Sequence, residues 1–144
     1  MSAAELYDRD FYEWTLRNAK LLRSGKAAEA DLDHIAEEIE DMGKRERREL
    51  ISRLGVLIGH LLKWQAQPDH RGRSWEAAIR LQRDEISDLL EEMPSLRRYL
   101  EANLVKAYRH GAIAASAETR LPVEDFPSTC PFSLDVLLDA GFLP

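Results

Sequence analysis

Arg53 and His60, seven positions apart, have side chains whose types and spacing could do chemistry. On an α-helix this spacing places both side chains on one face, two turns apart, with Leu57 between them. A histidine can act as a general acid or base near neutral pH, and an arginine can hold a phosphate group. Together they could cleave a phosphodiester.

An arginine followed by six residues and a histidine is similar to the active-site motif of the HEPN helical-bundle ribonucleases. In that family such pairs cleave RNA, often across a dimer interface. The polar residue that the motif usually carries between them is absent here, because Gly55, Val56 and Ile58 are apolar. A histidine close to Trp64 and several leucines is more often a hydrogen-bonded core residue, which is the structural alternative.

The structural alternative also predicts a location for His60. A turn near residue 70 is expected to join two antiparallel helices, so residues equally distant from the turn should face each other. His60 would then lie level with Arg80 and within a turn of Gln82 and Arg83. We expect these four residues to form a polar cluster at the edge of the core.

A metal site is the second chemical candidate, because His34, Glu38 and Asp41 follow one another at helical spacings of four and three. A ferritin-like di-iron bundle would use Glu-x-x-His motifs from two helices, and no glutamate here precedes a histidine by three positions. A salt-bridged surface explains the acidic helix better. No phosphate-binding loop or dinucleotide glycine pattern is present, so the sequence predicts neither metal nor cofactor.

A basic segment with two tryptophans is the third candidate. Trp64 and Trp75 lie on either side of the expected turn, with Arg71 and Arg73 between them. Tryptophan and arginine often anchor protein interfaces, and the same mixture can bind nucleic acid. The alternative is that the two tryptophans close the end of a helical bundle.

A long proline-free stretch over 31–66 should position most of these residues. Its apolar side chains recur every three or four residues, which predicts one helix. The pattern is interrupted after Met42 by a glycine and six charged residues, so a break near Gly43 is left open. Seven acids occupy 29–41 and five basic residues occupy 44–53, which suits either a solvated surface or a docking surface.

The rest of the chain predicts shorter helices and a tail that wraps onto them. Residues 1–9 are interpreted as a short arm, and the large apolar side chains after residue 121 should be buried: Phe126, Phe132, Leu134, Leu137 and Leu138. The expected N-caps are Asp10, Ser74 and Ser133. The expected helices are 10–24, 31–66, 75–92, 95–119 and 133–139. The sequence thus predicts a single all-α domain over 1–144, an up-down four-helix bundle with a long second helix and a proline-rich C-terminal wrap.

Composition limits the function classes. The 144 residues carry a net charge of −6, which argues against broad nucleic-acid binding. A single cysteine, the lack of a signal-peptide pattern and the lack of a membrane-spanning apolar run predict a cytoplasmic protein.

Several stretches resemble a bacterial family, largely cyanobacterial, that is catalogued as domain of unknown function 29: LYDRDFYEW, DLDHIAEEIEDMGKRERREL, HLLKWQAQPDHRGRSW, PSLRRYL and FPSTCPFSLDVLLD. The resemblance covers about residues 5–144. It implies an all-helical fold and no assigned activity. Because no complete catalytic set can be written from the sequence, we expect a non-enzymatic interaction or regulatory protein that binds a protein partner or itself, with a HEPN-like ribonuclease as the alternative.

Overall fold

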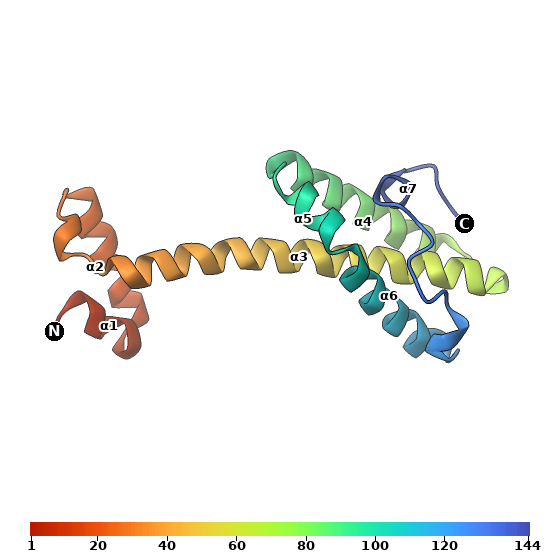
Figure 1. Ribbon diagram of the computed structural model, residues 1–144, viewed down its shortest axis with the longest axis horizontal. Helices are drawn as coiled ribbons and strands as arrows, with labels where there is room; N and C mark the ends of the chain where they lie inside the picture. Colours follow the sequence, from red (N-terminus) through yellow and green to blue (C-terminus); the bar gives the residue numbers. More distant parts are fainter. The chain divides into compact units, whose positions relative to one another are not determined.

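The structure is a computed structural model that describes all 144 residues, and it is all-α. Helices account for 78% of the chain and no strand occurs, so the all-α part of the predicted fold is confirmed. Figure 1 shows the seven α-helices. They are α1 (Ala3–Arg9), α2 (Phe11–Arg23), α3 (Leu32–Ala66), α4 (Arg73–Glu92), α5 (Leu96–Ala102), α6 (Leu104–Thr119) and α7 (Leu134–Leu138). Three single-turn 3₁₀ helices, Ala27–Glu29, Pro68–His70 and Val123–Asp125, lie in the connections.

Helix α3 is continuous through Gly43, so the predicted long helix is confirmed to within one residue at its start. A methyl group added at Gly43 would meet no other atom within 4 Å. The residues group into two compact units whose boundary lies within this helix, where the sequence indicated one domain. Unit 1 is Met1–Arg45 and unit 2 is Glu46–Pro144. The boundary coincides with the charged interruption of the apolar pattern.

Unit 1 begins with a helix, α1, where the sequence predicts a short arm. Ser2 accepts a hydrogen bond from the Glu5 amide, and the Glu5 side chain accepts one from the Ser2 amide, which together form a capping box. Asp10 caps α2 as predicted. Helix α2 packs against α1 rather than along the first half of α3, so the predicted four-helix bundle is incomplete.

The centre of unit 1 is polar. The Trp14 indole donates to Asp31 at 2.9 Å, and the Asp31 amide donates to the buried Asn18 side chain at 2.8 Å. Asn18 in turn donates to the Trp14 carbonyl. Only three apolar side chains of the unit are buried, those of Ala3, Leu6 and Trp14. Hydrogen bonds therefore contribute much of the interaction that joins the helices of this unit.

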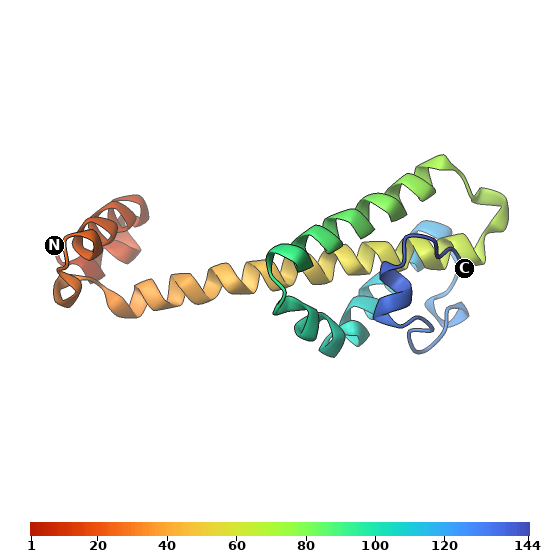
Figure 2. The same cartoon turned by 90° about the horizontal axis from the view of Figure 1, so that it is seen from above.

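Unit 2 has an extensive apolar core, in which the second half of α3 packs against α4 and α6 (Figure 2). The largest side chains that are almost completely buried are Leu50, Leu54, Leu57, Ile58, Leu61, Leu62, Ile86, Leu100 and Leu137. Six of these nine come from α3, whose apolar residues recur at helical spacing.

Helices α3 and α6 approach closely at glycines. A methyl group on Gly111 would lie 2.8 Å from the Gly55 carbonyl oxygen, and one on Gly59 would lie 3.2 Å from the Gly111 carbonyl oxygen. The absence of side chains at these glycines lets the two helix backbones come this close. Helix α6 is separate from α5, where one helix over 95–119 was expected, because Asn103 bonds back to the Tyr99 carbonyl and ends the first helix.

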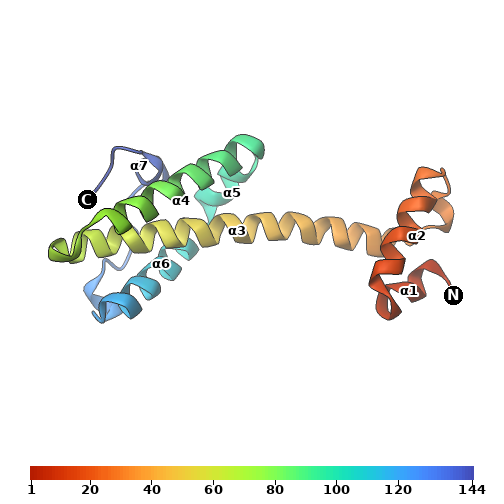
Figure 3. The same ribbon diagram turned by 180° about the vertical axis from the view of Figure 1, so that it is seen from behind.

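The C-terminal segment packs onto this core (Figure 3). Phe126, Phe132, Leu134 and Leu137 are buried and Leu138 is half-buried, which confirms the predicted wrap. Ser133 caps α7 as predicted. Helix α4, in contrast, begins before Ser74, and its N-cap position is held by Gly72, which lacks a capping side chain. Helix α7 lies against α4 and so covers part of that helix.

Candidate functional site

Arg53 and His60 face different helices. Arg53 pairs with Glu49 at 3.2 Å and reaches α4, where it lies 3.4 Å from Gln82 and 3.9 Å from Glu85. The His60 Nδ1 lies 2.9 Å from the Val56 carbonyl oxygen of its own helix. Its ring lines a cavity of about 50 Å³ against α6. The structure therefore does not bring the two side chains into one site.

The predicted polar cluster around His60 does not form either. Gln82 bonds to Arg53, Arg83 donates to the Leu137 carbonyl in the C-terminal segment, and Arg80 is exposed. The reason is that α6 crosses α3 at Gly55 and Gly59. The face that carries His60 is therefore turned toward α6 rather than α4.

Two of the three residues considered for a metal site, His34 and Glu38, are used in other contacts. The His34 Nδ1 lies 2.6 Å from the Asp31 carboxylate, and its ring stacks on Tyr7 with centroids 3.8 Å apart. The Tyr7 hydroxyl donates to Glu38 at 2.6 Å. No group of three or more His, Cys, Asp or Glu side chains is arranged to hold a metal ion. Asp41 belongs to no such group.

These contacts shift three pKa values. The hydrogen bond to Glu38, together with burial, raises the pKa of Tyr7 to about 12. The hydrogen bond to Asp31 raises the pKa of His34 above its ordinary value of 6.5. Burial would raise the pKa of Asp31, but hydrogen bonds from Trp14 and His34 outweigh it, so this pKa is lowered.

The two tryptophans of the basic segment pack against cations of the same unit. The Arg71 guanidinium lies 5.1 Å from the centroid of the Trp64 ring and donates to the Trp64 carbonyl. The buried Lys63 pairs with Glu118, and its ammonium lies 5.0 Å from the Trp75 ring. Trp64 is buried and Trp75 is half-buried, so these rings present little surface to a partner.

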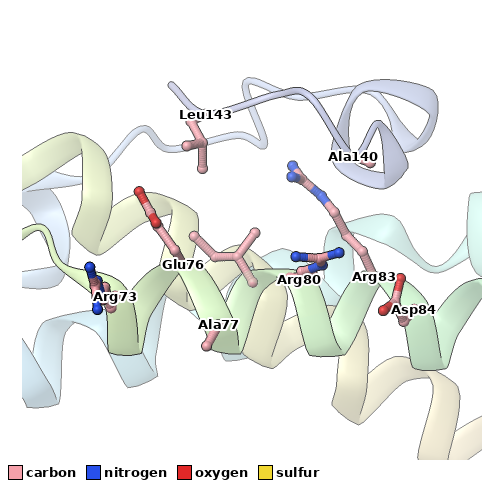
Figure 4. A pocket seen from close by; sticks show the side chains of 9 residues that line it. Arg73, Glu76, Ala77, Arg80, Arg83, Asp84, Ala140 and Leu143 are labelled. Atoms are coloured by element: carbon pink, nitrogen blue, oxygen red, sulfur yellow. The ribbon is translucent and has the colours of Figure 1, made fainter.

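Three arginines of α4 line a cavity with a volume of about 820 Å³. Figure 4 shows Arg73, Arg80 and Arg83 along the helix, with Ala140 and Leu143 of the C-terminal segment on the opposite side. The sequence predicts these arginines in two separate groups, Arg73 near the tryptophans and Arg80 and Arg83 near His60. Their spacing of seven and three is helical and could have shown one face, but the covering C-terminal segment could not be placed from sequence.

A second cavity, of about 520 Å³, lies between α6 and the C-terminal segment and is mostly apolar. The Tyr108 hydroxyl donates to the Pro127 carbonyl beside it. Burial raises the pKa of Tyr108 and also that of the Cys130 thiol, which lines the same cavity. This cavity has few polar groups that could orient a ligand.

Residues 6–143 match the family model described as domain of unknown function DUF29. The chain belongs to this family. No curated protein and no solved structure matches the chain. No helix of this DUF29 chain combines the length and apolar character needed to cross a membrane. The membership thus adds no catalytic residue, and the function of this DUF29 chain has to be argued from its own surfaces.

Proposed function

We propose that this DUF29 chain is a non-enzymatic interaction protein that associates with a second copy of itself through the first part of α3. The observation that carries the proposal is an exposed apolar stripe in unit 1. Leu32, Ile39 and Met42 expose 52%, 58% and 52% of their surface, and Ile35 beside them is half-buried. Spacings of three, four and three are those of a helix face that packs against another helix.

Unit 1 exposes more large apolar side chains than it buries. Eight large apolar side chains of this unit are exposed: Met1, Phe11, Tyr12, Leu16, Leu22, Leu32, Ile39 and Met42. Exposed apolar residues are common singly, but a stripe at helical spacing is typical of an interface. A partner that covers the stripe would supply the apolar burial that unit 1 lacks.

The residues that flank the stripe favour an antiparallel second copy. If Ile39 of one copy packs against Met42 of the other, Glu38 lies opposite the second copy's Arg45, and the reverse holds by symmetry. Arg45 has no ion pair within the chain, and one oxygen of Glu38 is free because Tyr7 bonds to the other.

The opposite flank of the stripe carries small residues. Ala36 and Gly43 lie on this side, and a methyl group at Gly43 would meet nothing within 4 Å. In the antiparallel register these two positions face each other, so the helices can approach closely. Opposite charges on one flank and small residues on the other are complementary to a second copy of the same helix.

Sedimentation equilibrium of the full chain tests the proposal. We expect a dimer for the unmodified chain and a monomer for Ile39→Glu, because the substitution places a carboxylate in the centre of the seam. Leu81→Glu is the matched control, since Leu81 of α4 is 56% exposed and lies outside the stripe. A monomeric unmodified chain, or a dimer that survives Ile39→Glu, would contradict the proposal.

A charge swap tests the antiparallel register. Glu38→Arg places like charges opposite each other and should weaken association, whereas Glu38→Arg combined with Arg45→Glu should restore it. Tyr7→Phe is the control for the lost Tyr7 hydrogen bond. A double variant as weak as the single one would show that the copies pair in another register.

The ribonuclease alternative receives no specific support, because Arg53 and His60 face different helices. Incubation with total RNA and EDTA, with His60→Ala as the control, would identify any such activity.

A further inference from the structure

The cavity between α4 and the C-terminal segment holds a buried cation with an unused donor. Arg83 is 5% exposed, and its Nε donates to the Leu137 carbonyl at 2.8 Å. Its Nη2 is buried and has no hydrogen-bond partner. A guanidinium stays charged in proteins, and a buried charged donor without a partner is costly. The arrangement therefore favours an anion at this place.

The direction of the side chain supports the same conclusion. In Figure 4 the Arg83 guanidinium extends from α4 into the space below the C-terminal segment that carries Leu143. The Leu137 carbonyl holds it there from α7. Burial lowers the pKa of Arg83, and Asp139 partly opposes this shift. The cation is thus fixed at the wall of a cavity rather than folded against a carboxylate.

Two more cations and a helix terminus line the same cavity. Arg73 and Arg80 are exposed and make no ion pair within the chain. Arg73 is also the first residue of α4, and Gly72 before it provides no side-chain cap. The free amides of this first turn add a second source of positive potential.

We propose that this cavity binds a small organic phosphate. Arginine forks match phosphate oxygens in a bidentate manner, which favours phosphate among the possible anions. The apolar Ile79, Ala140 and Leu143 can pack against an organic body, and Glu76 can accept a hydrogen bond from it. The volume lies within the range of metabolite-sized sites. The proposal is independent of self-association, because the whole cavity lies in unit 2.

Isothermal titration calorimetry of the full chain tests the proposal with three probes: adenosine monophosphate, pyrophosphate and succinate. We expect adenosine monophosphate to bind with a dissociation constant below about 1 mM, pyrophosphate to bind more weakly, and succinate to bind least. Arg80→Gln should weaken binding of adenosine monophosphate about tenfold or more, because it removes a charge-assisted hydrogen bond. Arg98→Gln, an exposed position outside the cavity, should leave binding unchanged.

Arg83→Lys provides a second variant that keeps the charge and loses the guanidinium fork. It should weaken binding at least as much as Arg80→Gln, and its melting temperature without ligand shows whether the fold is retained. Three results would overturn the proposal. They are no binding of either phosphate probe at about 10 mM, equal binding by Arg80→Gln and the unmodified chain, and much tighter binding of single-stranded RNA that is lost with the same arginines.

Discussion

Unit 1 and unit 2 are both built from α-helices, but different interactions stabilise the interior of each unit. Unit 2 buries a continuous set of leucines and isoleucines, and its glycines let α3 and α6 touch backbone to backbone. Unit 1 buries three apolar side chains and joins its helices through Trp14, Asn18 and Asp31. Apolar burial scales with area, whereas each hydrogen bond adds a small net amount. Unit 2 should therefore be the more stable of the two.

The largest expected difference comes from shortening an apolar side chain in each unit. Leu137→Ala should lower the free energy of unfolding by about 2–5 kcal/mol, because this side chain is fully buried. Leu32→Ala, at a half-exposed position of unit 1, should change it by less than about 0.5 kcal/mol in the monomer. Urea denaturation measures both free-energy changes when each substitution is made in the Ile39→Glu variant, which we expect to be monomeric. Equal costs would remove the contrast between the units.

Glycine-to-alanine substitutions should change stability in opposite directions in the two units. Gly111→Ala should destabilise by about 1–3 kcal/mol, because the added methyl group would lie 2.8 Å from both the Gly55 carbonyl oxygen and Ile58. Gly43→Ala meets no atom and should raise helix stability by about 1 kcal/mol in the monomer. Thermal melts in the Ile39→Glu background would show the two signs. A stabilised Gly111→Ala variant would mean that the crossing is looser than described.

Removing a polar link in unit 1 should have a smaller effect. Asn18→Ala takes away the acceptor for the Asp31 amide and should cost about 1 kcal/mol. Hydrogen exchange resolves where this cost falls. The amides of α1 and α2 should exchange faster and those of α4 and α6 should not change. Uniformly faster exchange would show that the two units unfold together.

The smallest effect is a pH dependence confined to unit 1. The pKa of His34 is raised by its hydrogen bond to Asp31, so the stabilisation is complete below the ordinary histidine pKa and is lost as pH rises through the raised value. The pKa of Asp31 is lowered, so its contribution is lost only as pH falls below the ordinary aspartate range. Between about pH 5 and pH 8, exchange protection of α2 should therefore decrease.

His34→Gln should remove the dependence that comes from the histidine. Glu37 and Asp8 also favour the protonated ring, so the Glu37→Gln variant should lower the midpoint without abolishing the transition. A slope that persists unchanged in His34→Gln would assign the pH dependence to another group.

The sequence predicts the helices better than it predicts their partners. Apolar periodicity over 31–66 predicts α3. The helix continues through the charged interruption because helical hydrogen bonds are local and need no apolar partner there. The four-helix bundle predicted from this periodicity would cover Leu32, Ile39 and Met42, yet these residues are exposed. Periodicity marks a face suited to packing but does not say which chain covers it.

The candidate site was less predictable, because side-chain partners depend on helix crossings. His60 was placed against α4 by counting from the turn, but close contact at Gly59 and Gly111 turns that face toward α6. Arg83 was assigned to the same cluster, while its actual partner, the Leu137 carbonyl, lies 54 positions along the chain. Capping signals were right for Asp10 and Ser133 and wrong for Ser74, and the Ser2–Glu5 pattern would have identified α1.

The half-buried Cys130 is a chemical probe of how the C-terminal segment packs against α6. Burial raises the pKa of this thiol and outweighs the opposing effect of the backbone hydrogen bond at Phe132, so little reactive thiolate is present. It is the single cysteine of the chain. The rate of alkylation by a thiol reagent therefore reports how well the segment and α6 shield this thiol. Comparison of that rate with the opening rates of the amides in α7 would show whether the segment detaches as one piece or residue by residue.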